Sequence, residues 1–321
     1  MLAALLLLAN WWLYAPANPS NRKSVYVTVA SGDTTGTVAA GLAARGLLHT
    51  PLGFILLAER RHWAGEVRPG TYRLSAAESP LAILTKMVKG QAINQISVTA
   101  GSTVSQVIDE LVAHQLGTRS QYRQWQRQGL PGMPPKLKGT QDAREGFLFP
   151  ATYALPRGAT AEAAIQAMWT NFQMATQNLR RQLPAGWSIR KWVTLASIVQ
   201  AEVKYPTDGP KVAAVFLNRL RKGMPLQSDA TVYYALGPTP RGPLTLADLN
   251  TPSAYNTYIV SGLPPGPIDN PGMTALSSVL HPAHVNYLYF LTLPDGRAEF
   301  AHTYAEQVQH IDQLDRINSS K

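Results

Sequence analysis

The sequence of 321 residues predicts an α+β protein with an N-terminal membrane helix, a small α/β domain and a larger α+β domain. Three observations carry this prediction. The chain starts with an apolar segment, a strand-plus-helix unit occurs twice in its first half, and helical patterns beyond residue 145 alternate with loops rich in Gly, Pro and polar residues. The length suffices for about two domains with a substantial hydrophobic core.

Charged side chains are scarce, although the balance between them is basic. Lys and Arg number 29 against 19 Asp and Glu, which gives a net charge of +10, but only 15% of residues are charged. A basic surface suits nucleic acid, anionic lipid or an acidic polymer, and composition does not choose among them. Because the chain has no cysteine, disulfide scaffolds, thiolate zinc sites and cysteine nucleophiles are excluded.

Residues 1–17, MLAALLLLANWWLYAPA, predict a membrane anchor. The run carries no charged side chain and ends in the aromatic residues Trp11, Trp12 and Tyr14, which are typical of a membrane interface. Its apolar part spans about 22 Å as a helix, less than the roughly 30 Å of hydrocarbon core. The segment is therefore either an anchor whose basic start is missing from this sequence or a signal peptide cleaved near Ala15–Ala17. We favour the anchor, with the remaining chain outside the cytoplasm at the inner or plasma membrane.

A strand-plus-helix unit occurs twice, 69 residues apart, at 32–47 and 101–116. The copies share Gly, Thr, Val, Leu and Ala at corresponding positions. In each copy the apolar positions follow helical spacing. Thr34 in the first copy and Ser102 or Thr103 in the second are available as helix N-caps.

The strands of this region are predicted from β-prone runs. Residues 25–29 and 96–99 precede the two helices, residues 67–74 predict a turn and a strand, and residues 80–88 predict a helix. Together they make residues 24–116 a small α/β domain. This domain is either a structural platform or a polymer-binding module.

Residues 117–144 predict a basic connector. They contain six Arg and Lys side chains and a break rich in Gly and Pro at 129–135. Tyr122 and Trp125 interleave with the basic residues, as in a nucleic-acid-binding stripe. No recognition module surrounds them, so we interpret this segment as a solvated helix face.

Residues 188–203, SIRKWVTLASIVQAEV, predict a helix with one apolar face and with Glu202 at the margin of that face. The helix ends before Pro206. Burial and the negative end of the helix dipole both favour a protonated carboxyl group there, as a general acid requires. The alternative is an exposed glutamate in the last turn. Gln200, on the flank of the helix, cannot exchange protons.

Polar side chains gather in two further segments. Residues 226–234 read as an extended run with Gln227, Asp229 and Thr231 on one side. Residues 255–258 place Tyr255 and Tyr258 around Asn256 and Thr257, and the stiff loop 262–267 can frame the rim of a cleft. Amides, hydroxyls and aromatic faces at this density suit a carbohydrate that bears N-acetyl groups.

No other type of site is indicated. His281 and His284 are close in sequence, but Pro282 lies between them and no carboxylate is near, so no metal site is predicted. Neither a G-x-S-x-G elbow nor a phosphate-binding GK[ST] loop is present. We expect no cofactor.

Five segments, in this order, resemble the endolytic murein transglycosylase family, known as MltG or YceG-like. They are EGFLFPATY (145–153), LASIVQAEV (195–203), VAAVFLNRLRKGMPLQSDATVYYALG (212–237), SAYNTYIVSGLPPGPIDNPG (253–272) and HPAHVNYLYF (281–290). The resemblance covers the chain from about residue 24 to near its end. It implies a membrane-anchored lytic transglycosylase with a LysM-like region over 24–116 and a catalytic domain over 145–315. Such an enzyme cleaves nascent peptidoglycan between MurNAc and GlcNAc, leaves a 1,6-anhydroMurNAc end and terminates glycan chain elongation.

The resemblance also implies the site residues. The catalytic glutamate corresponds to Glu202. Substrate-binding residues are expected in the matching segments, at Gln227, Asp229, Thr231, Tyr255, Asn256, Thr257, Tyr258, Glu145 and Asn218. Many members of the family carry Glu at the position of Gln200. If that position were the essential one, this chain would be inactive.

One good carboxyl candidate favours a particular mechanism. Glycosidases normally use two carboxylates, but Asp208 lies beyond the proline that ends the helix, and Asp229 resembles a positioning group. Glu202 can protonate the glycosidic oxygen and then deprotonate the muramoyl 6-hydroxyl, which attacks C1 of the same sugar. The tethered nucleophile replaces an activated water.

Two other function classes stay open from the sequence. One is a non-catalytic peptidoglycan-binding scaffold at the membrane surface, in which Glu202 is structural. The other is a basic nucleic-acid binder, which the apolar start and the low charge density disfavour. We expect glycan strands and the membrane as partners, with peptidoglycan synthases as further partners, and no nucleic acid.

Overall fold

The computed structural model describes residues 14–129, 132–133, 144–237 and 242–319. The chain divides into two compact units. Unit 1 contains Met1–Ile96 and Ala154–Ala159, and unit 2 contains Ser97–Tyr153 and Thr160–Lys321. The predicted membrane helix over 1–17 falls mostly outside the described residues, and within them no helix is long and apolar enough to cross a bilayer.

Unit 1 is built on antiparallel strands with helices packed against them. Its elements are β1 (Ser24–Val29), α2 (Thr35–Ala44), α3 (Pro51–Arg60), β2 (Gly70–Ser75), α4 (Pro80–Val88) and the start of β3 (Ile93–Val98). β1 pairs with β2 from Ser24↔Ser75 to Val29↔Gly70. Leu42, Phe54, Leu57, Tyr72 and Ile83 form the centre of its core. The strands predicted at 25–29 and 67–74 and the helix predicted at 80–88 are confirmed.

Both copies of the repeat have the predicted strand, turn and helix. Thr34 caps α2 by accepting from the Thr37 amide at 3.1 Å, and Thr103 caps α5 (Val104–Ala113) by accepting from the Gln106 amide at 3.3 Å. α5 belongs to unit 2, however. The division between units therefore differs from the predicted region 24–116, because α5 packs in the other unit.

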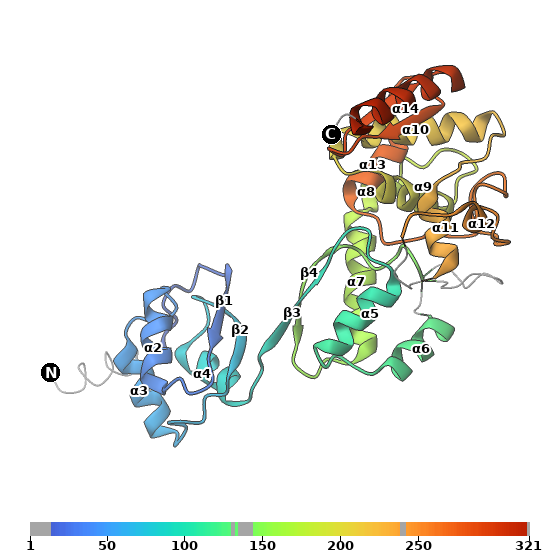
Figure 1. The fold of residues 1–321 in the computed structure, drawn as a ribbon. Coiled ribbons are helices and arrows are strands. Elements are labelled where there is room, and N and C mark those ends of the chain that lie inside the picture. Colours follow the sequence, from blue (N-terminus) through green and yellow to red (C-terminus); the bar gives the residue numbers. More distant parts are fainter. Residues whose placement is uncertain (1–13, 130–131, 134–143, 238–241, 320–321) are drawn as a thin grey trace. The chain divides into compact units, whose positions relative to one another are not determined.

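Unit 2 is mostly helical. Its elements are α5, α6 (Arg119–Gln128), β4 (Ala151–Pro156), α7 (Ala161–Ala175), α8 (Gln177–Arg180), α9 (Ile189–Glu202), η1 (Pro206–Asp208), α10 (Gly209–Arg221), α11 (Asp229–Leu236), α12 (Leu246–Leu249), α13 (Met273–Leu280), β5 (Tyr289–Thr292), β6 (Ala298–Ala301) and α14 (Tyr304–Ser319). β3 and β4 each have residues in both units, and the larger sheet has the order β1-β2-β3-β4. α9 packs against α10, α11 and α13 (Figure 1).

The helix predicted over 188–203 is α9, and it is more central than its sequence pattern suggests. Ser188 caps it by accepting from the Lys191 amide at 3.1 Å. Trp192 is fully buried and donates its indole N–H to the Leu276 carbonyl at 2.9 Å. Ser197, on another side of the helix, is also fully buried. α9 therefore fixes Glu202 from inside the core of unit 2.

The connector predicted over 117–144 is a solvated helix face only in part. α6 presents its Arg side chains to solvent, but Tyr122 is fully buried and Trp125 is 6% exposed. The Tyr122 hydroxyl donates to the Leu116 carbonyl. The two aromatic residues therefore anchor α6 to unit 2, and the rest of this segment lies largely outside the described residues.

The predicted extended run at 226–234 is wrong, because residues 229–236 form the helix α11. β-branched and aromatic side chains favour a strand in isolation. Here they lie in a helix of eight residues that packs against the core, with Thr231 and Val232 fully buried. Gln227 precedes the helix and Asp229 begins it, so they do not share a strand face with Thr231.

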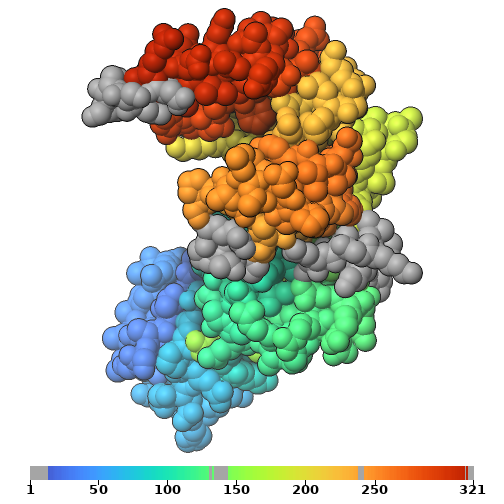
Figure 2. Space-filling view, turned by 45° about the vertical axis from the view of Figure 1, so that its right-hand side comes forward, coloured from blue at the N-terminus to red at the C-terminus, as the bar shows by residue number. Residues whose placement is uncertain are grey.

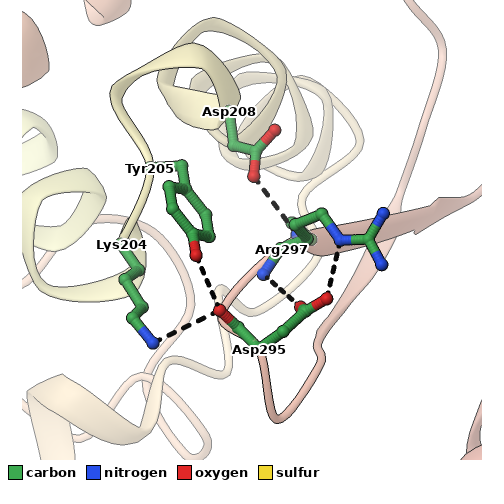
Figure 3. A network of polar contacts seen from close by, with 6 residues as sticks. Lys204, Tyr205, Asp208, Asp295 and Arg297 are labelled. Carbon is green, nitrogen blue, oxygen red and sulfur yellow. Dashed lines mark hydrogen bonds and ion pairs between the residues drawn. The ribbon is translucent and has the colours of Figure 1, made fainter.

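The segment after α9 is tied to the hairpin of β5 and β6 (Figure 3). The Tyr205 hydroxyl donates to the Asp295 carbonyl at 2.9 Å, and Asp208 accepts from the Ala298 amide at 3.2 Å. Arg297 pairs with the Asp295 carboxylate at 2.7 Å.

The segment around residue 250, orange in Figure 2, lies on the surface, where Leu246 is 81% exposed.

Candidate active site

Glu202 is the last residue of α9, and its side chain is half-buried where the helix ends. The Ser228 hydroxyl donates to Glu202 Oε1 at 2.5 Å. Burial raises the pKa of Glu202, the hydrogen bond from Ser228 lowers it, and the nearby charge of Asp229 raises it again. Burial is the largest of these causes, so the carboxyl group holds its proton to higher pH than an exposed glutamate. A general acid requires this property.

Ser228 is held by two buried threonines. Its amide donates to Thr257 Oγ1 at 3.0 Å, and its carbonyl accepts from Thr231 Oγ1 at 2.7 Å. The two threonine hydroxyls lie 2.8 Å apart. Since Thr231 gives its proton to Ser228, Thr257 is the donor between them, and one arrangement of protons satisfies the network. The backbone of Ser228 is therefore fixed, and its hydroxyl stays directed at Glu202.

Asp229 and Tyr258 form a second pair beside Glu202. The Tyr258 hydroxyl donates to Asp229 Oδ1 at 2.5 Å. Burial raises the pKa of Tyr258, and the hydrogen bond to Asp229 and the charges of Asp229 and Glu202 raise it further. Tyr258 therefore remains a neutral donor, while Asp229 is exposed to solvent.

Arg219 of α10 holds the loop that leads to Ser228. It is 8% exposed and donates through Nη1 to the Leu226 carbonyl at 2.8 Å and to Gln227 Oε1 at 3.3 Å. Gln227 has a φ of 52°, in the left-handed region that L-residues avoid. Such strain persists where the surrounding structure imposes it, and it is concentrated at functional sites.

A cleft of about 470 Å³ lies beside these residues. Its wall includes Ala201 and Ala230, the sequence neighbours of Glu202 and Asp229. Tyr233 and Tyr234 of α11 also line it, and Tyr233 is 38% exposed. Aromatic faces next to carboxyl groups suit a sugar ring, because the ring buries its apolar face while its hydroxyls find polar partners.

The chain matches the model of the YceG-like family over residues 27–313. It belongs to that family. The endolytic murein transglycosylase of Bacillus subtilis is 30% identical over 96% of this chain and 89% of its own length. That of Streptococcus pneumoniae strain R6 is 26% identical over 95% of this chain and 60% of its own length. A crystal structure of a putative YceG-like protein from Listeria monocytogenes superposes with a TM-score of 0.63 at 28% identity, covering 89% of this chain and 99% of that one.

The structure places four of the predicted substrate-binding residues of this YceG-like protein in supporting positions. Tyr255 is 2% exposed, and its ring lies 4.9 Å from that of Tyr234. The Asn256 side chain donates to two backbone carbonyls at 2.9 Å each, and that of Asn218 donates to two at 3.0 and 2.8 Å. Glu145 accepts from the first amide of α5, that of Val104, at 2.8 Å.

These four residues and the buried Thr231 and Thr257 support the more exposed side chains of the site. Gln227, Asp229 and Tyr258 are the predicted binding residues with exposed or half-buried side chains close to Glu202. Gln200 accepts from the Gly272 amide at 3.0 Å, which ties α9 to the loop before α13. Residues 262–265 of the loop 262–267 line a different cavity, of about 710 Å³, together with Trp187 and Lys191.

Three side chains at this site, Ser228, Arg219 and Asp269, were not among the residues predicted from the sequence. Ser228 was overlooked because an extended run at 226–234 would direct its side chain away from those of Gln227 and Asp229. Hydrophobic periodicity does not identify Arg219 or Asp269. Arg219 acts through a loop that only tertiary packing brings near it, and the position of Asp269 depends on the packing of its proline-rich loop. The acidic residue in the run GPIDNPG was the available clue to Asp269.

Ser228→Ala removes the hydrogen bond that lowers the pKa of Glu202, so this pKa should rise further. We expect the alkaline limb of the kcat/KM profile, where the acid loses its proton, to move to higher pH. Activity at the optimum should fall by about tenfold, the equivalent of one charge-assisted hydrogen bond. The control is Ser278→Ala, because Ser278 is a buried serine that donates to the Thr274 carbonyl. A profile with an unmoved limb would contradict the role of Ser228.

The left-handed backbone of Gln227 predicts an inverted order of stability. Gln227→Gly should be more stable than Gln227→Ala by about 1 kcal/mol, because a Cβ is strained at this φ. At an ordinary loop position alanine is the more stable of the two. Urea unfolding of both variants measures the difference, and equal midpoints would show that residue 227 carries no strain.

Proposed function

We propose that this protein is an endolytic murein transglycosylase in which Glu202 acts as both acid and base. The observation that carries the proposal is the half-buried Glu202 carboxyl, held by Ser228 next to a cleft lined by tyrosines. The names of the relatives from Bacillus subtilis and Streptococcus pneumoniae support the reaction class. The substrate is the MurNAc–GlcNAc bond of nascent glycan strands, whose cleavage terminates chain elongation.

The reaction needs one carboxyl group and no water. Protonated Glu202 gives its proton to the glycosidic oxygen as the bond to C1 of MurNAc breaks. The resulting carboxylate takes the proton from the 6-hydroxyl of the same MurNAc, and the 6-oxygen bonds to C1. The products are a 1,6-anhydroMurNAc end and a GlcNAc end with a free hydroxyl, and Glu202 is protonated again.

Other residues of the site support this cycle. Asp229, held by Tyr258, supplies negative charge beside Glu202 and so helps to keep it protonated before the bond breaks. The same charge stabilises the positive charge that develops at C1 in the transition state. Gln227 and the exposed face of Tyr233 are positioned to bind the glycan.

The proposal extends to the location of the enzyme. Residues 1–17 anchor the chain to the inner or plasma membrane, with both units outside the cytoplasm and within reach of peptidoglycan synthases. Unit 1 belongs to the LysM-like, glycan-binding region of this proposal, which its two antiparallel strands with two helices between them support.

The test is the fate of the oxygen at C1. The full chain is incubated in detergent with uncrosslinked glycan strands in heavy-oxygen water, and the chain ends are analysed by mass spectrometry. We expect anhydromuramoyl ends without label, because no water enters the reaction. Labelled reducing ends would identify a hydrolase, and unchanged strands would identify a non-catalytic scaffold.

A further inference from the structure

Asp269 is a buried carboxyl group that the proposed reaction leaves unused. It lies in the loop before α13, and its side chain is 4% exposed. It lines the same cleft as Ala201 and Tyr233. Its Oδ1 has no hydrogen-bond partner among the residues that the structure describes.

The backbone around Asp269 is firmly held on both sides. The Ile268 amide donates to the buried Ser197 hydroxyl of α9 at 3.0 Å. The Asn270 amide donates to the Ser102 carbonyl at 3.0 Å, and the Asn270 side chain donates to the same carbonyl at 2.8 Å. Asp269 is therefore placed by its neighbours, and its carboxyl group contributes nothing to that placement in the described part of the chain.

A buried polar group without a partner costs free energy, and native proteins rarely keep one without a reason. Burial raises the pKa of Asp269 well above its usual range. Glu145, the other carboxyl group on the cleft wall, differs because it accepts from the Val104 amide. A ligand in the cleft can supply this partner, because Asp269 lines the cleft wall.

We propose that Asp269 is a substrate-binding residue that forms a hydrogen bond with a sugar group in this cleft, either a hydroxyl or an acetamido N–H. The inference rests on the proposed function for the class of ligand. It assigns a fixed polar contact to the wall of the cleft and gives Asp269 no part in the acid–base steps. The inference therefore concerns glycan binding and not proton transfer. The contact satisfies Oδ1 only when glycan is bound.

The test measures glycan binding and stability separately. Calorimetry with a purified N-acetylated glycan oligosaccharide is carried out on the full chain carrying Glu202→Gln, which prevents turnover. Adding Asp269→Leu should weaken binding by about tenfold, the loss of one hydrogen bond, whereas Asp269→Asn should keep it within about threefold. Without glycan, Asp269→Leu should have an equal or higher Tm, because an unsatisfied buried group is removed.

The control is Asp109→Leu, because Asp109 is an exposed acid of α5 outside the cleft lining. Unchanged binding by Asp269→Leu overturns the inference, as does a lower Tm, which would make Asp269 a structural residue. Absence of glycan binding by the Glu202→Gln chain overturns it too. If binding behaves as expected but the unsubstituted chain releases no anhydro ends, the proposed function fails and the inference stands.

Discussion

Glu202→Gln should reduce the release of anhydromuramoyl ends by roughly ten-thousand-fold. General acid–base catalysis contributes about 10² to 10⁴ in rate, and here one residue supplies both the acid and the base. Glutamine keeps the shape of the side chain and can accept from the Ser228 hydroxyl, but it cannot transfer a proton. The measurement is mass analysis of chain ends after incubation with uncrosslinked glycan.

The control for this substitution is Glu162→Gln, an exposed glutamate in the first turn of α7, which should leave activity unchanged. Glu202→Gln should also unfold at no lower denaturant concentration than the unsubstituted chain. The folded state favours the protonated form of Glu202, so its stabilising contribution is present below the pKa of the unfolded chain and is lost as pH rises through the raised pKa. Glutamine is neutral at every pH. Full activity of the variant would make Glu202 a structural residue.

Gly146→Ala should destabilise the protein by roughly 2–5 kcal/mol. The φ of Gly146 is 88°, and a Cβ would lie 2.6 Å from Pro267 Cγ and 2.7 Å from Val193 Cγ1. Neither neighbour can yield easily, because Val193 is fully buried in α9 and Pro267 lies in a stiff loop. The substitution therefore combines backbone strain with overpacking, and chemical denaturation measures the sum.

Gly223→Ala separates the two contributions. Gly223 has a φ of 68°, but nothing lies within 4 Å of an added Cβ. It should cost about 1–2 kcal/mol, the strain alone. If Gly146→Ala destabilises the protein no more than Gly223→Ala, residues 145–147 do not pack closely against α9 and the loop 262–267.

The central helix and its acid were predictable because local signals agree there. Ser188 provides an N-cap, apolar residues follow helical spacing through Val199, and Pro206 prevents continuation, so the sequence places Glu202 at a helix end. The helix boundaries in the structure, Ile189–Glu202, match that prediction. The degree of burial was not predictable, since polar Thr194 and Ser197 are buried only because other helices surround α9.

The rest of the site depends on contacts between distant segments. Ser228 meets Glu202 across 26 positions, and Asn270 meets Ser102 across 168. The run at 226–234 has strand-like composition, yet packing against α9 selects a helix. Periodicity reports which face of one element is apolar, and it carries no information about which loop lies against that face.

The second copy of the repeat belongs to unit 2, and its first residues form part of the cleft wall. Gly101 and Thr103, at the start of that copy, line the cleft beside Asp269. A fragment cut at residue 117, where the repeat ends in the sequence, would lose one wall of the site together with the backbone partner of Asn270. The two copies of the repeat thus lie in different units, and a fragment that keeps the whole cleft must include the second copy.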